Sequence, residues 1–155
     1  IILNDLIEYN FGEFEGQTAD ELKNDEVFKE WLSGGPDAAP PFGESNAEFG
    51  ARISGAFEKI VEGMFKTSVT EATIVTHGGV IMGLMSHFAL PELPMPEWLS
   101  PNGCGYTVRI TPSLWTHARK MEVVEEIPYV EVPDDERYDD FGDQMTGFGF
   151  VEMED

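Results

Sequence analysis

The sequence predicts an α/β fold organised around a strand, a tight turn and a helix within residues 72–90. The first five of these residues, Ala-Thr-Ile-Val-Thr, are mostly apolar or β-branched, as in a buried parallel strand. A histidine and two glycines form the predicted turn, and the helix after it has apolar residues at helical spacing. Two further patterns fit this fold class: an amphipathic helix at residues 46–65 and an alternating strand at residues 106–110.

The predicted turn places His77 at the carboxyl end of the strand, where open α/β sheets bind their ligands. Gly78 and Gly79 allow a sharp turn and a close approach of the backbone to a ligand. The free N–H groups and the dipole of the following helix favour an anion at its start. A histidine there can donate to a phosphate oxygen or move a proton. This segment alone supports two interpretations equally: a turn that binds a ligand, and an ordinary turn whose histidine is hydrogen-bonded within the protein.

The N-terminal part is predicted to form a strand, an ordered loop and a helix. The chain opens on an apolar run that is a candidate strand, and residues 4–17 are too rich in glycine and acidic residues for regular structure. Thr18 and Glu21 have the spacing of a capping box, so a helix is expected from there to about Leu32. A bend is expected near residues 24–25, and two glycines and a proline end the helix.

The clearest predicted helix covers residues 46–65, after a proline-rich loop at residues 36–43. Its apolar residues recur at spacings of three and four, which puts them on one face of a helix. They are Phe49, Ile53, Phe57, Ile60 and Met64.

Short elements are predicted after the central helix. Prolines exclude regular structure at residues 91–96, and residues 101–103 are predicted to form a turn. The alternating strand at residues 106–110 follows, and residues 111–116 are expected to turn the chain. Residues 120–127 read as another strand, antiparallel to the last and near a sheet edge.

The chain of 155 residues is long enough for one domain with a substantial core, and its formal net charge is −21. This charge excludes nucleic acids and anionic membranes as expected partners, because both would repel the protein. An anionic substrate would need local positive charge, and the whole chain has only nine lysines and arginines.

Cysteine content and hydrophobicity both bear on the expected location. Cys104 is the single cysteine, so it can form no internal disulfide, which favours a reducing compartment such as the cytoplasm. A small buried residue is the better interpretation of Cys104 than a nucleophile. No apolar run approaches about 18 residues, so no membrane-spanning helix is expected.

The last part of the chain, residues 128–155, differs in composition from residues 1–127, which we expect to form one domain. Ten of its 28 residues are acidic, which alone would predict a disordered tail. It also contains five aromatic residues, so we expect it to dock on this domain or on a second copy in a homodimer. These residues are Tyr129, Tyr138, Phe141, Phe148 and Phe150.

Four stretches, in order, resemble motifs of the histidine phosphatase superfamily, which has the phosphoglycerate-mutase-like fold. Residues 6–16, L-I-E-Y-N-F-G-E-F-E-G, resemble its L-x-E-x-x-F-G-x-W-E-G stretch. Residues 43–45, Gly-Glu-Ser, followed by Arg52, resemble its G-E-S…R helix start. Residues 74–79 resemble its second histidine motif, and residues 101–103, Pro-Asn-Gly, its P-N-G turn.

The resemblance covers roughly residues 3–126 and implies a three-layer α/β sandwich with a mostly parallel sheet and helices on both faces. It implies phosphoryl transfer through a phosphohistidine, with no metal or organic cofactor. In the family, the histidine of an Arg-His-Gly motif attacks phosphorus, two arginines and a second histidine hold the phosphoryl oxygens, and an acid protonates the leaving group. By motif position, Glu8 matches the acid, His77 the second histidine, and Gly78 the turn glycine beside the phosphate.

The family's Arg-His-Gly motif does not occur in this sequence. Because the chain also opens inside an apolar run rather than at a methionine, we expect it to be a fragment, with nucleophile and arginine clamp upstream of Ile1. The predicted protein is a phosphomonoester hydrolase for a small phosphorylated substrate, with the missing N-terminal segment as a partner. The fragment alone is expected to be inactive. A phosphoglycerate-type mutase and an inactive phosphatase-like binding domain are the alternatives.

Arg52 and two of the histidines are predicted to have no role in catalysis. Arg52 is expected to form an ion pair with Glu44 or Glu48 rather than to contact substrate. His87 and His117 are expected to be surface or packing residues, and their spacing matches no metal motif. Specificity is expected to come from the loops at residues 36–43 and 91–100.

Overall fold

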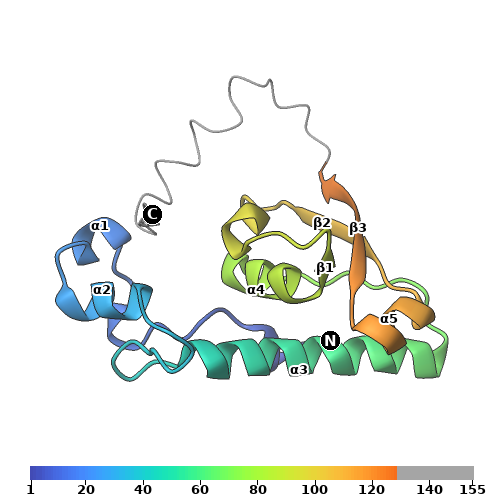
Figure 1. The fold of residues 1–155 in the computed structure, drawn as a ribbon, viewed down its shortest axis with the longest axis horizontal. Helices are drawn as coiled ribbons and strands as arrows, with labels where there is room; N and C mark the ends of the chain where they lie inside the picture. The colour runs from blue at the N-terminus through green and yellow to red at the C-terminus, as the bar shows by residue number, and fades with distance from the viewer. Residues whose placement is uncertain (129–155) are drawn as a thin grey trace, which may run out of the picture. The chain divides into compact units, whose positions relative to one another are not determined.

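The computed structural model describes residues 1–128, which fall into two compact units (Figure 1). The larger unit contains residues 1–9 and 48–128, and the smaller unit contains residues 10–47. The acidic tail from residue 129 onward, with its predicted aromatic docking, lies outside the described residues.

The smaller unit contains a 3-10 turn, η2 (Gly12–Phe14), and two short helices, α1 (Ala19–Leu22) and α2 (Glu26–Leu32). The predicted capping box is confirmed, and its hydrogen bonds from the Thr18 N–H and hydroxyl lower the pKa of the Glu21 carboxyl. One bent helix was expected here, but the helix breaks. Asp25 has extended backbone and its side chain accepts from Phe28 N (3.0 Å), so it caps a new helix.

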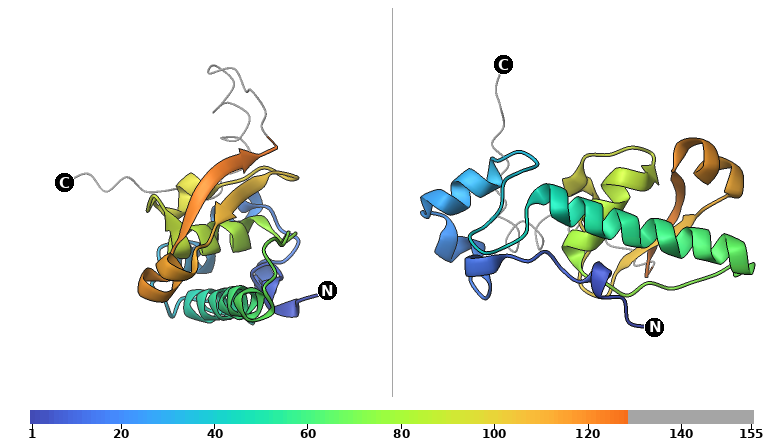
Figure 2. Two further views of the ribbon diagram at one scale, coloured as in Figure 1. Left: turned by 90° about the vertical axis from the view of Figure 1, so that its right-hand side faces the viewer. Right: turned by 90° about the horizontal axis from the view of Figure 1, so that it is seen from below.

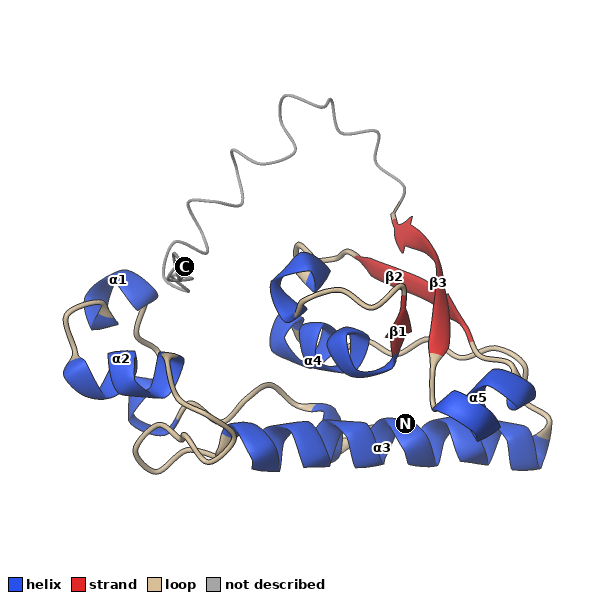
Figure 3. Cartoon of the chain, in the orientation of Figure 1, coloured by secondary structure: helices blue, strands red, loops and turns tan. Residues whose placement is uncertain are grey.

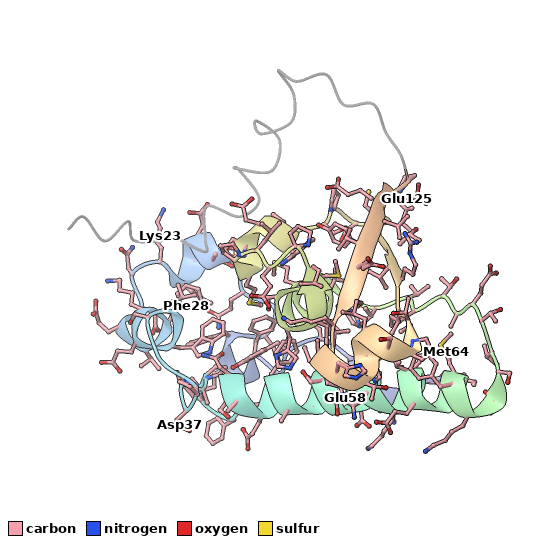
Figure 4. All side chains as sticks on the ribbon, turned by 45° about the vertical axis from the view of Figure 1, so that its right-hand side comes forward. Lys23, Phe28, Asp37, Glu58, Met64 and Glu125 are labelled. Carbon is pink, nitrogen blue, oxygen red and sulfur yellow. The ribbon has the colours of Figure 1, made fainter. Side chains whose placement is uncertain are left out.

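Aromatic side chains form the core of the smaller unit. Phe28, labelled on α2 in Figure 4, packs edge-on against Phe14, with ring centroids 5.4 Å apart. Trp31 lies 5.7 Å from Phe28 and meets Phe11 edge-on at 5.9 Å. Such pairs contribute beyond the burial of their area, which suits a unit whose helices are too short to be stable alone.

The larger unit contains two of the predicted helices and one that was not predicted. Helices α3 (Asn46–Thr67) and α4 (Gly78–Phe88) confirm the expected positions. Residues 111–116 were expected to be a turn, but α5 (Pro112–Ala118) forms there. Thr111 caps it by accepting from Leu114 N (3.2 Å), and the proline occupies the first turn, where no N–H is needed.

Packing between α3, α4 and α5 forms the core of the larger unit, and α4 lies between α3 and the strands (Figures 1 and 2). Phe57, Phe88 and Trp115, one from each helix, have ring centroids 5.3 to 6.0 Å apart. Gly83 faces α3 so closely that a Cβ there would lie 2.6 Å from Ile53 Cδ1. Among the helices of residues 1–128, none is long and apolar enough to cross a membrane.

Three strands form a mixed sheet in the order β1 (Ala89–Leu90), β3 (Met121–Ile127), β2 (Gly105–Arg109) (Figure 3). The strand β1 pairs parallel with β3, and β2 pairs antiparallel with it. An α/β combination is therefore confirmed, whereas the mostly parallel sheet and the three-layer sandwich are not. The antiparallel pair is as predicted, but β3 lies in the middle of this sheet rather than at its edge.

The predicted central strand at residues 72–76 is not a strand in this structure. The segment is irregular, Ile74 and Val75 are 37% and 93% exposed, and no backbone hydrogen bond joins it to the rest of residues 1–128. The N-terminal apolar run likewise forms no strand, and Ile1 and Ile2 are exposed. A strand exists only where a neighbour pairs with its N–H and C=O groups, and apolar pattern alone does not supply one.

The proline-rich stretch is partly irregular, as predicted, but it also contains a 3-10 turn, η3 (Met95–Trp98). The predicted turn at residues 101–103 is confirmed. Cys104 N donates to Pro101 O (3.0 Å), and Gly103 has a φ of 80°, which a glycine adopts without strain.

Candidate functional site

Glu8 lies in the larger unit, after the 3-10 turn η1 (Asn4–Leu6), and its side chain is partly buried. Its Oε1 accepts from Tyr9 N (2.9 Å), and its Oε2 accepts from Gly79 N (3.1 Å), 71 positions further along the chain. The carboxylate therefore lies at the N-terminus of α4.

His77 is the N-cap residue of α4. Its backbone is extended and its carbonyl accepts from Ile81 N (3.0 Å), while its side chain makes no capping bond and is exposed. Gly78, the next residue, borders open space, because a Cβ there would meet no atom within 4 Å. At Gly79 that space is filled by the Glu8 carboxylate.

The structure thus brings the stretch that carries Glu8 to the turn that carries His77 and Gly78. The start of a helix offers N–H groups without partners inside the helix, and its dipole favours negative charge. The anionic group bound there in this structure is the carboxylate of Glu8 itself. A phosphate beside Gly78 could use the same N–H groups, with a carboxyl and an imidazole within its surroundings.

Arg52 on α3 binds backbone carbonyls before and at Glu8. Its Nη1 donates to Asp5 O and Ile7 O, both at 3.0 Å, and its Nη2 donates to Glu8 O at 3.2 Å. Sequence reasoning did not foresee these bonds, because carbonyl partners leave no trace in residue identity. The expected ion pair of Arg52 with Glu44 or Glu48 stays a prediction.

The Gly-Glu-Ser motif closes a loop inside the smaller unit. Glu44 Oε1 accepts from Asn10 N (2.8 Å), and Glu44 N donates to Asn10 O (3.1 Å). Gly12 has a φ of 54° and packs directly against the carbonyl of Pro41. The two N-terminal motif stretches therefore meet here, and part of the resemblance reflects how this loop is built.

The other two histidines lie outside this arrangement, as predicted. His87 is exposed near the C-terminus of α4, with its ring edge-on to Phe88 at 4.5 Å. His117 is exposed on α5, where its Nδ1 bonds to Ser113 O (2.8 Å). Within residues 1–128, no group of His, Cys, Asp and Glu side chains is arranged to hold a metal ion.

A cavity of about 590 Å³ lies at the opposite end of α4. Lys120 is held there by Glu92 Oε1 (2.8 Å) and His87 O (2.9 Å), and the hydrogen bond and charge of Lys120 lower the pKa of the Glu92 carboxyl. Arg119, also in the lining, pairs with Glu62 (3.1 Å). Because both cations already have partners and no predicted site residue lines it, this cavity is not our candidate site. The lining consists of Ser86, His87, Glu92, Leu93, Pro94, Ala118, Arg119 and Lys120.

Comparison with known families gives one match. The family model described as histidine phosphatase superfamily (branch 1) matches residues 1–122, most of the chain. No curated protein and no solved structure matches. The matched range agrees with the extent of the motif resemblance.

Proposed function

Because the chain belongs to the histidine phosphatase superfamily, we propose that it is part of a phosphomonoester hydrolase that acts through a phosphohistidine. The superfamily covers phosphatases and mutases, so the specific activity is the proposal. The observation that supports it is the bond from Gly79 N to the Glu8 carboxylate. Through this bond Glu8, which matches the family's acid, lies at the N-terminus of α4, where His77 is the N-cap residue.

Each residue has a role that its position suits. The substrate phosphate would lie beside Gly78, where open space adjoins the first N–H groups of α4. His77, exposed at the N-cap, would donate to the phosphoryl oxygens as their charge develops. The phosphate would compete with Glu8 for the Gly79 N–H. The displaced carboxylate would take up a proton from solvent beside the negative phosphate and would then give that proton to the leaving oxygen.

The nucleophilic histidine and the arginine clamp of this proposal lie upstream of Ile1, on a strand that pairs with residues 72–76. The open backbone of this segment and the exposed side chain of Val75 support it. An apolar, β-branched segment whose backbone makes no hydrogen bond within the described residues is a template for an added strand. The arginines would also supply the positive charge that a chain of net charge −21 lacks.

An inactive phosphatase-like binding domain is the second candidate, favoured by the absence of an Arg-His-Gly motif from these 155 residues.

A phosphoglycerate-type mutase would use the same residues as the proposed hydrolase. It would differ in shielding the phosphohistidine from water long enough to pass the phosphoryl group to an acceptor.

The test is a phosphate-release time course with p-nitrophenyl phosphate and several alkyl phosphates. It compares residues 1–155, the full-length gene product, and three full-length variants: His77→Ala, His117→Ala, and the upstream histidine changed to Ala. We expect no turnover by residues 1–155 and robust turnover by the full-length protein. Turnover should fall about 100-fold in His77→Ala, which is the effect of losing one oxyanion donor, and it should be unchanged in His117→Ala.

Turnover by residues 1–155 alone would contradict the upstream nucleophile. A full-length protein that is inactive on every phosphomonoester would favour the binding domain. Transfer to an added acceptor in preference to water would favour the mutase.

A further inference from the structure

We infer that Arg52 is a positioning residue that holds Glu8 at the start of α4. The inference rests on the proposed acid role of Glu8. The guanidinium donates to the carbonyls of Asp5, Ile7 and Glu8 at 3.0, 3.0 and 3.2 Å. These carbonyls lie before and at the acid, so the cation fixes the course of the backbone that presents the carboxylate.

An arginine is suited to this task because it offers several donors in one rigid plane and stays charged at every working pH. The segment after η1 has no helix or strand to hold it, so its carbonyls need other donors. A hydrogen bond from a charged donor contributes more to stability than one from a neutral donor. Arg52 therefore supplies the hydrogen-bond donors that a helix or a paired strand would otherwise supply to these carbonyls.

The helix that carries Arg52 is anchored beside the same segment. Arg52 lies over the ring of Phe49, one turn earlier on α3, with 5.2 Å from Cζ to the ring centroid. Phe49 in turn packs against Tyr9, with ring centroids 4.9 Å apart, and both rings are buried. Residues 5–9 are thus held by α3 through three backbone carbonyls and the ring of Tyr9.

The other side of the segment is held by the stretch before α4. Thr76 Oγ1 donates to Leu6 O (2.6 Å), and Gly79 N donates to Glu8 Oε2 (3.1 Å). Glu8 is therefore fixed between α3 and the start of α4, two elements that position a catalytic group more accurately than a free loop does. Loss of Arg52 removes one side of this arrangement, while the side chains of Glu8 and His77 themselves are unchanged.

The test uses the full-length protein with Arg52→Met, Arg52→Lys and the control Arg109→Met. Arg109 also carries an ion pair on the larger unit, but its side chain is exposed and its contact with Glu122 is long (3.6 Å). Amide hydrogen exchange at Tyr9 and Gly79 is the first readout, because both N–H groups donate to the Glu8 carboxylate. We expect exchange about tenfold faster in Arg52→Met, less in Arg52→Lys and unchanged in Arg109→Met.

Kinetics with two leaving groups is the second readout. A general acid matters for an alkyl phosphate, whose leaving oxygen needs a proton, and little for p-nitrophenyl phosphate, whose anion is stable. Glu8→Gln and Arg52→Met should both lower kcat for the alkyl phosphate by about tenfold or more, with little change for p-nitrophenyl phosphate. The double variant should be no slower than Glu8→Gln, because both changes remove the same function.

Three results would overturn the inference. One is unchanged exchange at Tyr9 and Gly79 in both Arg52 variants. Another is equal loss on the two substrates in the folded Arg52→Lys protein, which would mean that Arg52 has a structural role only. The third is a double variant whose fold-loss in kcat equals the product of the fold-losses of the two single variants. If Glu8→Gln shows no leaving-group effect, the acid role in the proposed function fails, and the exchange result still decides whether Arg52 holds the segment.

Discussion

Two neighbouring glycines at the start of α4 have opposite surroundings. A Cβ on Gly78 would meet no atom within 4 Å, whereas a Cβ on Gly79 would press against the carboxylate of Glu8. Both residues lie in the first turn of the helix, so alanine has the same helix propensity advantage at either position. Any difference between the two alanine variants therefore reports the fit of Glu8.

We predict that Gly79→Ala is less stable than Gly78→Ala by about 1 kcal/mol, the value of one hydrogen bond. The atoms that the new methyl group would meet are the end of the Glu8 side chain, which can rotate about its own bonds, so the methyl group displaces the carboxylate from Gly79 N instead of distorting the backbone. Denaturant unfolding of the two variants gives the difference in free energy, and the amide chemical shift of Tyr9, whose N–H donates to the same carboxylate, reports the displacement. Equal stabilities with an unchanged shift would mean that Glu8 does not occupy this place in solution.

Aromatic contacts join the helical elements of the larger unit. Phe57 of α3, Phe88 of α4 and Trp115 of α5 pack with ring centroids 5.3 to 6.0 Å apart. Phe88 is fully buried and immediately precedes β1, so it also fixes where the sheet begins. The orientation of α4, and with it the position of His77 at its other end, depends on this cluster.

At this scale, we predict that Phe88→Ala lowers the free energy of unfolding by about 3–5 kcal/mol, because it leaves a cavity that the surrounding rings cannot fill. The matched control is Phe65→Ala near the end of α3, where the side chain is 39% exposed and the cost should be about 1 kcal/mol or less. Denaturant unfolding followed by circular dichroism measures both. Similar losses in the two variants would contradict the central position of Phe88.

For the whole molecule, the feature that needs explanation is the backbone of residues 72–76, which makes no backbone hydrogen bond within residues 1–128. Apolar, β-branched residues predict a buried strand here, yet Val75 is 93% exposed and the segment pairs with nothing in residues 1–128. An exposed apolar segment with an unpaired backbone invites pairing or aggregation, as an exposed strand edge does. Our proposal assigns the place to an upstream strand.

We predict that the amides of residues 73–76 exchange about 100-fold more slowly in the full-length protein than in residues 1–155, because a paired strand opens only by local unfolding. Hydrogen-exchange mass spectrometry compares the two proteins directly, with the irregular residues 91–93 as an internal reference that should not change. Equal exchange at residues 73–76 would show that no added strand pairs there.

Local signals in the sequence were sufficient for α3, for α4 and for the start of α1. Spacing of apolar residues predicted α3 and α4, and the Thr18–Glu21 capping box was confirmed. These features depend on residues three or four apart, so the chain itself carries the information. The N-terminus of α5, a threonine followed by proline, has a signal in the sequence too, but these residues also suit the turn that is predicted there.

Pairing partners could be found only in the tertiary structure. The sequence identified Glu8 and His77 as site candidates through motif resemblance, and folding brings Glu8 to the helix that His77 caps. It could not reveal that Arg52 binds three backbone carbonyls, because every residue has a carbonyl. Nor could it decide that residues 72–76 stay unpaired in this chain while residues 121–127 lie at the centre of the sheet. Hydrogen bonds between segments far apart in sequence depend on which backbones meet in space, and residue type specifies that only weakly.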